Sequence, residues 1–342
     1  MIRSTRIVAT GGGVLALALG VTLSAAVAQE TFKGQTVRII TGFPAGSASD
    51  PYSRTLARHI GRYLPGNPTV VPIVMPGAGS LKAANYLYNG APKDGTEFGL
   101  VASAMLNEDL LGNPAAEYDA EKFNWIGRFS SFFQVTLTWH TSKVKTIDDA
   151  MTTEAVIGGT GAGSGASLQP EVLSRVLGVK FKMVHGYPSS TAALVALERG
   201  EIDGTTNGWG TIAVSKAEWL RTKKINVLVQ YGLKRHADIP NVPRSVDLAK
   251  TAEQKQLLAL YASAGDLGKS YMAPPGVPPA RVALLRAAFD ATVKDRDFVA
   301  EVHKQGLDFD PLPGTDIQDL VLERVKDTSP AVIEQARRLF QK

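Results

Sequence analysis

In the first half of the chain, short β-branched runs alternate with stretches in which apolar residues recur at helical spacing. This pattern predicts strands that are each followed by a turn and a helix. Between residues 50 and 64, Tyr52, Leu56 and Ile60 lie near helical spacing, with Asp50 suited to the N-cap and Pro51 to the first helical position. The predicted strands are residues 35–43, 69–75 and 95–103, and the predicted helices are residues 50–64 and 81–91. This alternation predicts an α/β domain with a mainly parallel sheet.

The same pattern restarts after Trp125 and predicts a second α/β unit. Its predicted strands are residues 132–140, 154–159, 180–187 and 224–232, with a helix at 168–178, a helix that leads into a short strand at 190–204, and mostly helix at 278–306. No flexible linker separates the two units, which indicates lobes joined by crossing strands. We expect lobe 1 to comprise residues 30–133 plus 262–342 and lobe 2 residues 134–261, with a ligand cleft between them.

Composition and the N-terminus indicate an exported globular protein. The 342 residues are 44% hydrophobic and 20% charged, and the net charge of +5 forms no basic stripe, so we expect no nucleic-acid partner. Residues 1–28 have a basic start, an apolar stretch and a small-x-small end at Ala26–Ala28, typical of a cleaved signal peptide. Because the chain has 0 cysteines, it has neither disulfides nor a lipid-anchored cysteine, and we expect the mature chain to be free in the periplasm.

Three turns rich in glycine and hydroxyl residues each follow a predicted strand and precede a predicted helix. They are residues 43–50 (FPAGSASD), 76–80 (PGAGS) and 158–167 (GGTGAGSGAS). The first N–H groups of a helix lack internal partners and lie at the positive end of its dipole. Such turns can therefore hold a carboxylate or phosphate without a cationic side chain, although each also fits an ordinary tight connection.

Other motifs fail on spacing. Gly161, Gly163 and Ala166 form a loose dinucleotide fingerprint that lacks the acidic residue about 20 positions later, and neither a phosphate loop nor a G-x-S-x-G elbow occurs. The five histidines are scattered, so we expect no metal and no cofactor. A periplasmic hydrolase that uses Ser164 or Ser80 with a histidine stays open as an alternative.

Several segments, in order, resemble the extracytoplasmic receptors of the tripartite tricarboxylate transporters, the Bug-type solute-binding proteins. RIITGFPAGSASD, VVPIVMPGAGS, APKDGTEFGLVAS, GGTGAGSGASL, GYPSSTAALVALERGEIDG and ADIPNVPRSVD are similar to motifs of that family across the mature chain. The resemblance implies a two-lobed type II periplasmic-binding-protein fold that closes on a small carboxylic acid and delivers it to permease subunits in the membrane. It implies a monomeric binding protein and no enzyme. A ligand-sensing accessory of a membrane receptor kinase is a further alternative.

The resemblance also implies a set of ligand-binding positions. On lobe 1 these are Phe43, Ala45, Gly46, Ser47 and Asp50, with Gly77, Ala78 and Gly79; on lobe 2 they are Thr160, Gly163, Ser164, Tyr187 and Asn207. Ser103 and Ser130, near strand ends, are expected to line the cleft, Arg128 is a candidate counter-ion and Trp209 a candidate stacking platform.

The chain departs from the family pattern at four positions. Val74 and Met75 replace a basic or Asn-Arg pair, Pro188 replaces a lysine, and Asn207 replaces an acidic residue. An amide at position 207 adds hydrogen-bond donors, which suits an acidic or amide-bearing ligand.

Overall fold

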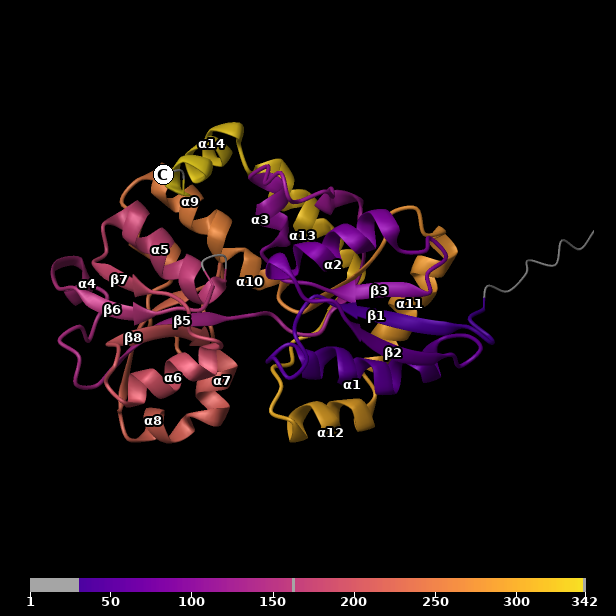
Figure 1. Ribbon diagram of the computed structural model, residues 1–342, viewed down its shortest axis with the longest axis horizontal. Helices are drawn as coiled ribbons and strands as arrows, with labels where there is room; N and C mark the ends of the chain where they lie inside the picture. Colours follow the sequence, from indigo (N-terminus) through magenta and orange to yellow (C-terminus); the bar gives the residue numbers. More distant parts are fainter. Residues whose placement is uncertain (1–30, 162–163, 341–342) are drawn as a thin grey trace, which may run out of the picture. The chain divides into compact units, whose positions relative to one another are not determined.

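The computed structural model describes residues 31–161 and 164–340, and two separate β-sheets organise this part of the chain (Figure 1). We refer to each sheet with the helices packed on it as the sheet A half and the sheet B half. The signal peptide predicted for residues 1–28 lies outside the described residues.

Sheet A has the strand order β11-β4-β10-β3-β1-β2. Its strands are β1 (Thr36–Thr41), β2 (Thr69–Val74), β3 (Glu97–Leu100), β4 (Asn124–Arg128), β10 (Ser270–Ala273) and β11 (Leu312–Pro313). β1 pairs in parallel with β2 and β3, whereas β10 pairs antiparallel with both β3 and β4. Strands β1 to β4 therefore share one direction, and β10 and β11 run against them.

Sheet B has the strand order β7-β6-β8-β5-β9. Its strands are β5 (Gln134–Trp139), β6 (Ala155–Gly158), β7 (Phe181–Val184), β8 (Gly204–Gly208) and β9 (Ile225–Tyr231). β6 pairs in parallel with β7 and β8, and β5 pairs antiparallel with β8 and β9. Only β5 therefore opposes the common direction, so both sheets are mixed but have mostly codirectional strands.

Helices cover both faces of sheet A. They are α1 (Asp50–Ile60), α2 (Leu81–Asn85), α3 (Met105–Leu110), α11 (Pro279–Thr292), α12 (Arg296–Lys304) and α13 (Gly314–Asp327). Ile39 of β1 packs with α1, α11 and α12 in one apolar core, whereas its neighbour Ile40 packs with α2, α3 and α13 in another. This follows from the two-residue period of a strand, which sends successive side chains to opposite faces.

Sheet B is covered in the same way. Its helices are α4 (Asp149–Thr152), α5 (Gly165–Leu177), α6 (Ser190–Glu198), α7 (Trp209–Ser215), α8 (Ala217–Arg221), α9 (Ala252–Ala262) and α14 (Pro330–Phe340). The short helix α10 (Ala264–Leu267) follows α9, but its Leu267 packs in the sheet A core with α2, α3 and α13. Ile157 of β6 joins the core formed with α5 and α9, and Val135 of β5 joins the core formed with α6, α7 and α8. Val332 and Ala336 of α14 belong to the core with α5 and α9, although α14 lies in the range expected for lobe 1.

The structure differs from the sequence-based expectations at several elements. Strands β4 and β10 were not anticipated, because nearly all their residues are buried and no apolar alternation marks them. The segment 278–306, expected to be mostly helix, consists of the two helices α11 and α12, and the Asp295 side chain caps the second. Asp50 is the first residue of α1 rather than its N-cap, which is Ser49, so Pro51, expected at the first helical position, is the second residue of the helix.

Candidate functional site

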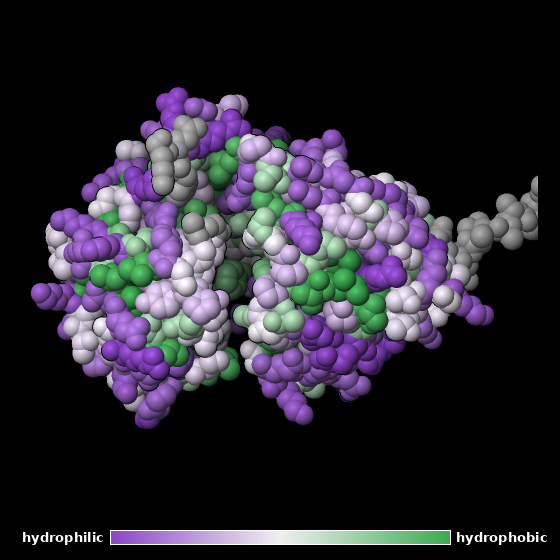
Figure 2. Space-filling view, viewed as in Figure 1, coloured by the Kyte–Doolittle hydropathy of each residue, from purple (hydrophilic) through white to green (hydrophobic). Residues whose placement is uncertain are grey.

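The expected ligand-binding turns lie at one edge of each sheet, where the codirectional strands end. In sheet A these ends lead into residues 42–49, 75–80 and 101–104, and in sheet B they lead into residues 159–164 and 185–189. The short segment 129–133 connects the end of β4 in sheet A to the start of β5 in sheet B, so it joins these two edges directly. Figure 2 shows a hollow between the two halves. Ligands in open α/β folds bind outside the carboxyl ends of strands, which makes this region the candidate site.

In the first turn, the side chain of Asp50 stabilises the loop by accepting hydrogen bonds from within it and from α1. Its Oδ2 accepts hydrogen bonds from the Gly46 N–H and the Arg54 Nε, both at 2.9 Å. Burial alone would raise the pKa of Asp50, but these hydrogen bonds outweigh it and lower the pKa below its ordinary value. The N–H groups of Ser47 and Asp50 also bond within the turn. The amides of Gly46, Ser47 and Asp50 therefore have partners in the chain.

The second turn is fastened to the first by Ser80. The Ser80 Oγ donates to the Gly42 carbonyl oxygen at 2.9 Å, and a Cβ on Gly42 would lie only 2.7 Å from the Ser80 Cβ. Ala78 and Ser80 both have positive φ, of 45° and 82°. This conformation is unfavourable for residues with a Cβ. Gly77, Ala78 and Gly79 are exposed, so the tip of this turn is accessible.

Three further candidates on the sheet A half differ in accessibility. Ser103 is half-buried after β3, and Ser130 is fully buried, with its Oγ lacking a partner among the described residues. Arg128 is 7% exposed, and its guanidinium donates to the Asp266 carbonyl oxygen and to Asp310. Arg128 also lines a hollow of about 860 Å³ that contains none of the three glycine-rich turns. Its role as a ligand counter-ion stays a prediction.

On the sheet B half, the third turn leads into α5. The Thr160 hydroxyl donates to the Ser164 Oγ at 2.6 Å, and both residues are half-buried. Gly163, also expected to contact the ligand, lies outside the described residues. A Cβ on Gly165 would lie 2.3 Å from Oε1 of Gln134, so the start of α5 touches the start of β5.

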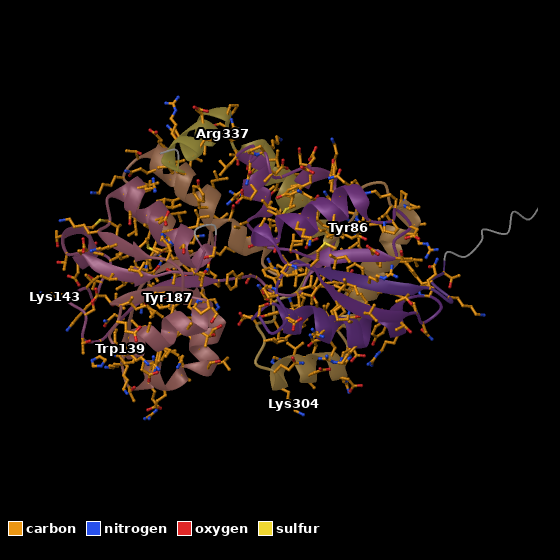
Figure 3. The ribbon with its side chains drawn as sticks, viewed as in Figure 1. Tyr86, Trp139, Lys143, Tyr187, Lys304 and Arg337 are labelled. Atoms are coloured by element: carbon orange, nitrogen blue, oxygen red, sulfur yellow. The ribbon has the colours of Figure 1, made fainter. Side chains whose placement is uncertain are left out.

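The remaining candidates on this half pack beside the same edge. Tyr187, labelled in Figure 3, lies against Gly158, at 3.1 Å from an ideal Cβ there. Asn207 is 3% exposed, donates to the Ser190 carbonyl oxygen and accepts from the Gly208 N–H. Trp209 is 5% exposed, and its indole Nε1 donates to Asp238. The ligand roles of these residues stay predictions.

A histidine does approach a serine near the third turn, but the serine is Ser167. The His185 Nδ1 lies 3.2 Å from the Ser167 Oγ, and its Nε2 lies 3.0 Å from Oε1 of Glu171. Ser167 is 0% exposed, so no substrate could reach its hydroxyl in this arrangement. Ser80 donates to Gly42 and Ser164 accepts from Thr160, and neither is paired with a histidine in the described residues.

Sequence reasoning missed Lys269, which lies at the sheet A edge directly before β10. Its Nζ donates to the Ser49 Oγ at 2.8 Å, and the residue is 8% exposed. Burial lowers the pKa of Lys269 to about 8, and the charge of Asp308 opposes that shift. Burial likewise raises the pKa of Asp308, and Lys269 opposes it. No pattern in the sequence marks this lysine, because the strand that follows it, β10, was itself not predicted.

Asp308 is also where the two halves touch. It follows α12 of the sheet A half, and a Cβ built on Gly210 of α7 would lie 1.5 Å from its Oδ1. The ring of Phe132, in the crossing segment, similarly lies 3.1 Å from an ideal Cβ on Gly208. Contacts near the candidate site therefore join sheet B to residues of the sheet A half and of the crossing segment.

Within residues 31–161 and 164–340, no three histidine or acidic side chains come together as a metal site. No helix of these residues is both long and apolar enough to cross a membrane.

Two mixed sheets, each flanked by helices and joined at one edge by crossing strands, define the type II periplasmic-binding-protein fold. Solved structures share it. A TctC solute-binding protein from Polaromonas superposes with a TM-score of 0.66 at 18% identity, covering 89% of this chain and 100% of that one. MatC from Rhodopseudomonas palustris, solved with bound malate, gives a TM-score of 0.62 at 19% identity, covering 87% and 98%. At these identities the likeness shows the fold alone.

The family is shown by sequence. The model of the tripartite tricarboxylate transporter family receptor, TctC, matches residues 53–337, and the chain belongs to this family. It is also 26% identical over 258 residues to the UPF0065 protein in gbd 5'region of Cupriavidus necator, covering 72% of this chain and 75% of that protein.

Proposed function

We propose that this chain is a periplasmic receptor that binds a small organic carboxylate between the two sheet edges and delivers it to the membrane subunits of a tripartite transporter. The observation that carries the proposal is the position of the three glycine-rich turns in a member of the TctC family. All three follow strands that end at the two edges joined by segment 129–133. A small ligand there would touch both halves at once.

The proposed binding relies on several modest interactions. A helix N-terminus contributes roughly 0.3–1 kcal/mol to an anion and a charge-assisted hydrogen bond about 1.5–3 kcal/mol. Micromolar affinity corresponds to about 8 kcal/mol, so one turn alone is insufficient and groups from both halves must take part. Ligand contacts to both halves would drive a hinge closure. Relatives of this fold have been solved with malate and with adipate, which makes both acids suitable probes.

Isothermal titration of the mature chain, residues 29–342, tests the proposal. The panel is succinate, malate, adipate, citrate and benzoate, with the diamide of adipic acid as the uncharged control. We expect at least one acid to bind with about micromolar affinity and the diamide to bind at least tenfold more weakly. Absence of binding by every acid would refute the proposed function.

The remaining parts of the proposal have their own measurements. Export predicts that N-terminal sequencing of the protein from the periplasmic fraction begins at Gln29. We also propose that the receptor is monomeric, which light scattering on a sizing column would check. It is further proposed to release its ligand unchanged, so nuclear magnetic resonance of adipate after long incubation should show no product. Delivery to a permease predicts that uptake of the bound acid is lost when the receptor gene is deleted.

A further inference from the structure

The ammonium of Lys269 is held firmly at the sheet A edge. The Lys269 N–H donates to the Ser130 carbonyl oxygen at 2.7 Å, and the Lys269 carbonyl oxygen accepts from the Phe129 N–H at 2.9 Å. Its main chain is thereby fixed to the crossing segment between the two halves. The Nζ reaches Ser49, the N-cap residue of α1, at the end of the first glycine-rich turn. The charge is therefore placed within the candidate site by main-chain geometry.

Aromatic rings surround this ammonium. The Nζ lies 4.6 Å from the ring centroid of Phe132, 5.2 Å from that of Phe43 and 5.6 Å from that of Tyr52. Tyr52 is buried, whereas Phe43 and Phe132 are half-exposed. The approach from solvent therefore lies on the side of the two phenylalanines, and Phe43 belongs to the first turn.

The hydrogen-bonding capacity of Lys269 is not satisfied within the chain. An ammonium has three N–H donors. Among the described residues, the Ser49 Oγ is the one oxygen that accepts a hydrogen bond from this ammonium, and no carboxylate forms a salt bridge with it. The titratable groups that face Lys269 are Tyr52 from α1 and Asp308 from the segment after α12, with Asp310 and His236 acting on Asp308. A buried ammonium that no carboxylate contacts directly lowers stability, and the carboxylate of a bound ligand would supply that contact.

We propose that Lys269, with the Ser49 hydroxyl, binds a carboxylate of the ligand and determines the specificity of the site. The proposal rests on the proposed function and adds the ligand class. The rings of Phe43 and Phe132 offer no partners to hydroxyl groups. The ligand therefore carries this carboxylate on an apolar stem, which favours adipate over the hydroxy acids malate and citrate. The amides of Gly46, Ser47 and Asp50 are already bonded within the first turn, so a side-chain cation takes their place.

The test compares Lys269→Met, Lys269→Arg and a matched control in titrations of the mature chain with adipate. The control is Lys216→Met, because the Lys216 ammonium also lies over an aromatic ring, Trp219, at 4.2 Å but has Glu198 at 3.9 Å as its partner. At pH 7 we expect Lys269→Met to weaken adipate binding about ten- to hundredfold and Lys216→Met to leave it unchanged. Lys269→Arg should retain most of the affinity.

The pH profile supplies a readout that a structural role would not move. The ligand carboxylate favours charged Lys269, whose pKa in the free protein is about 8. The Kd of the wild type should therefore rise above pH 8, in total by no more than the ten- to hundredfold expected for Lys269→Met. The Kd of Lys269→Met and Lys269→Arg should change little over the same range.

The outcomes separate this proposal from the proposed function. If the wild type binds adipate and Lys269→Met binds it equally well, the role of Lys269 is overturned and the receptor function stands. Tighter binding of malate than adipate would overturn the apolar-stem class. If the wild type binds no acid of the panel, the receptor function is refuted. The thermal stability of Lys269→Met, compared with that of the wild type, then tests the role of Lys269. A less stable Lys269→Met would show a structural lysine and overturn the proposal, whereas a more stable variant would support a charge kept for an anionic guest.

Discussion

The contact between Gly210 and Asp308 predicts that Gly210→Ala weakens ligand binding without weakening the fold. An ideal Cβ at Gly210 would lie 1.5 Å from Oδ1, 2.3 Å from Cγ and 2.6 Å from Oδ2 of Asp308. Since carbon and its non-bonded neighbours pack at roughly 3.5 Å, the carboxylate would have to withdraw by about 2 Å. Gly210 belongs to α7 on sheet B and Asp308 to the sheet A half. The clash therefore lies between the two halves and not inside either of them.

The size of the effect follows from the clash and from the helix. Overpacking of this kind costs about 1–3 kcal/mol, and it applies only to the arrangement in which the two residues touch. Within α7 itself, alanine is favoured over glycine by roughly 0.5–1 kcal/mol. We therefore expect the affinity for a bound acid to fall about 5- to 100-fold. The free energy of unfolding should stay the same or rise slightly.

Titration calorimetry and thermal melts on Gly210→Ala, Asp308→Ala and the double variant measure both effects. Asp308→Ala removes the atoms that clash, so the loss of affinity caused by Gly210→Ala should disappear in its presence, with a coupling of about 1–3 kcal/mol. If Gly210→Ala binds like the wild type, or if its effect is the same with and without the Asp308 carboxylate, the two halves do not meet here during binding. That result would refute the reasoning.

Three further outcomes follow from single contacts. Asp50→Asn should destabilise the protein by about 2 kcal/mol at pH 7 through weaker bonds to the first turn and Arg54. The depressed pKa of Asp50 means that this difference, measured by thermal melts, should shrink as the pH falls below about 4. The pKa of Lys269 is about 8 in the folded protein and about 10.5 for an ordinary lysine, so between these pH values the unfolded chain holds more protons than the folded one. Stability should therefore rise with pH across that window, relative to Lys269→Met, by about 3 kcal/mol in urea titrations. Gly42→Ala should cost about 1–3 kcal/mol in the same assay, because its Cβ would meet Ser80 at 2.7 Å, and Ser80→Gly in the same chain should restore much of the loss.

Local patterns in the sequence predicted much of the architecture. The β1–α1 and β6–α5 units appear where β-branched runs and helical spacing place them, because each pattern reports on which face of its own element is buried. The turns between them were visible from glycine and serine content. Their position at the two connected edges then follows from strand direction. Motif order carried the family resemblance, which the match over residues 53–337 confirms.

Features that depend on distant partners were beyond the sequence. The burial of Lys269 results from Ser49, 220 positions away, and from rings on other elements. Arg128 was expected near the ligand, but which acceptors its guanidinium finds depends on Asp310, 182 positions away. Val332 of α14 packs with the sheet B core, and no local feature of the sequence shows this. Periodicity shows which face of an element is buried, but it does not show which other element covers that face.

The first turn and Lys269 together change the expected source of positive charge in the site. Glycine-rich turns at helix starts led us to expect main-chain amides as the anion-binding groups. Here Asp50, itself an anion, already accepts the Gly46 amide and lies at the first turn of α1, where it lowers the positive potential available to a guest. The carboxylate of Asp50 would repel an anionic ligand at that turn unless a nearby cation compensated for it. Lys269 lies at the same turn, its Nζ bonded to Ser49 beside Asp50, and its buried position weakens screening by solvent. Asp50 fixes the conformation of the turn, and Lys269 provides the positive charge. Removing Lys269 should therefore leave the conformation of the turn unchanged but lower its affinity for anions.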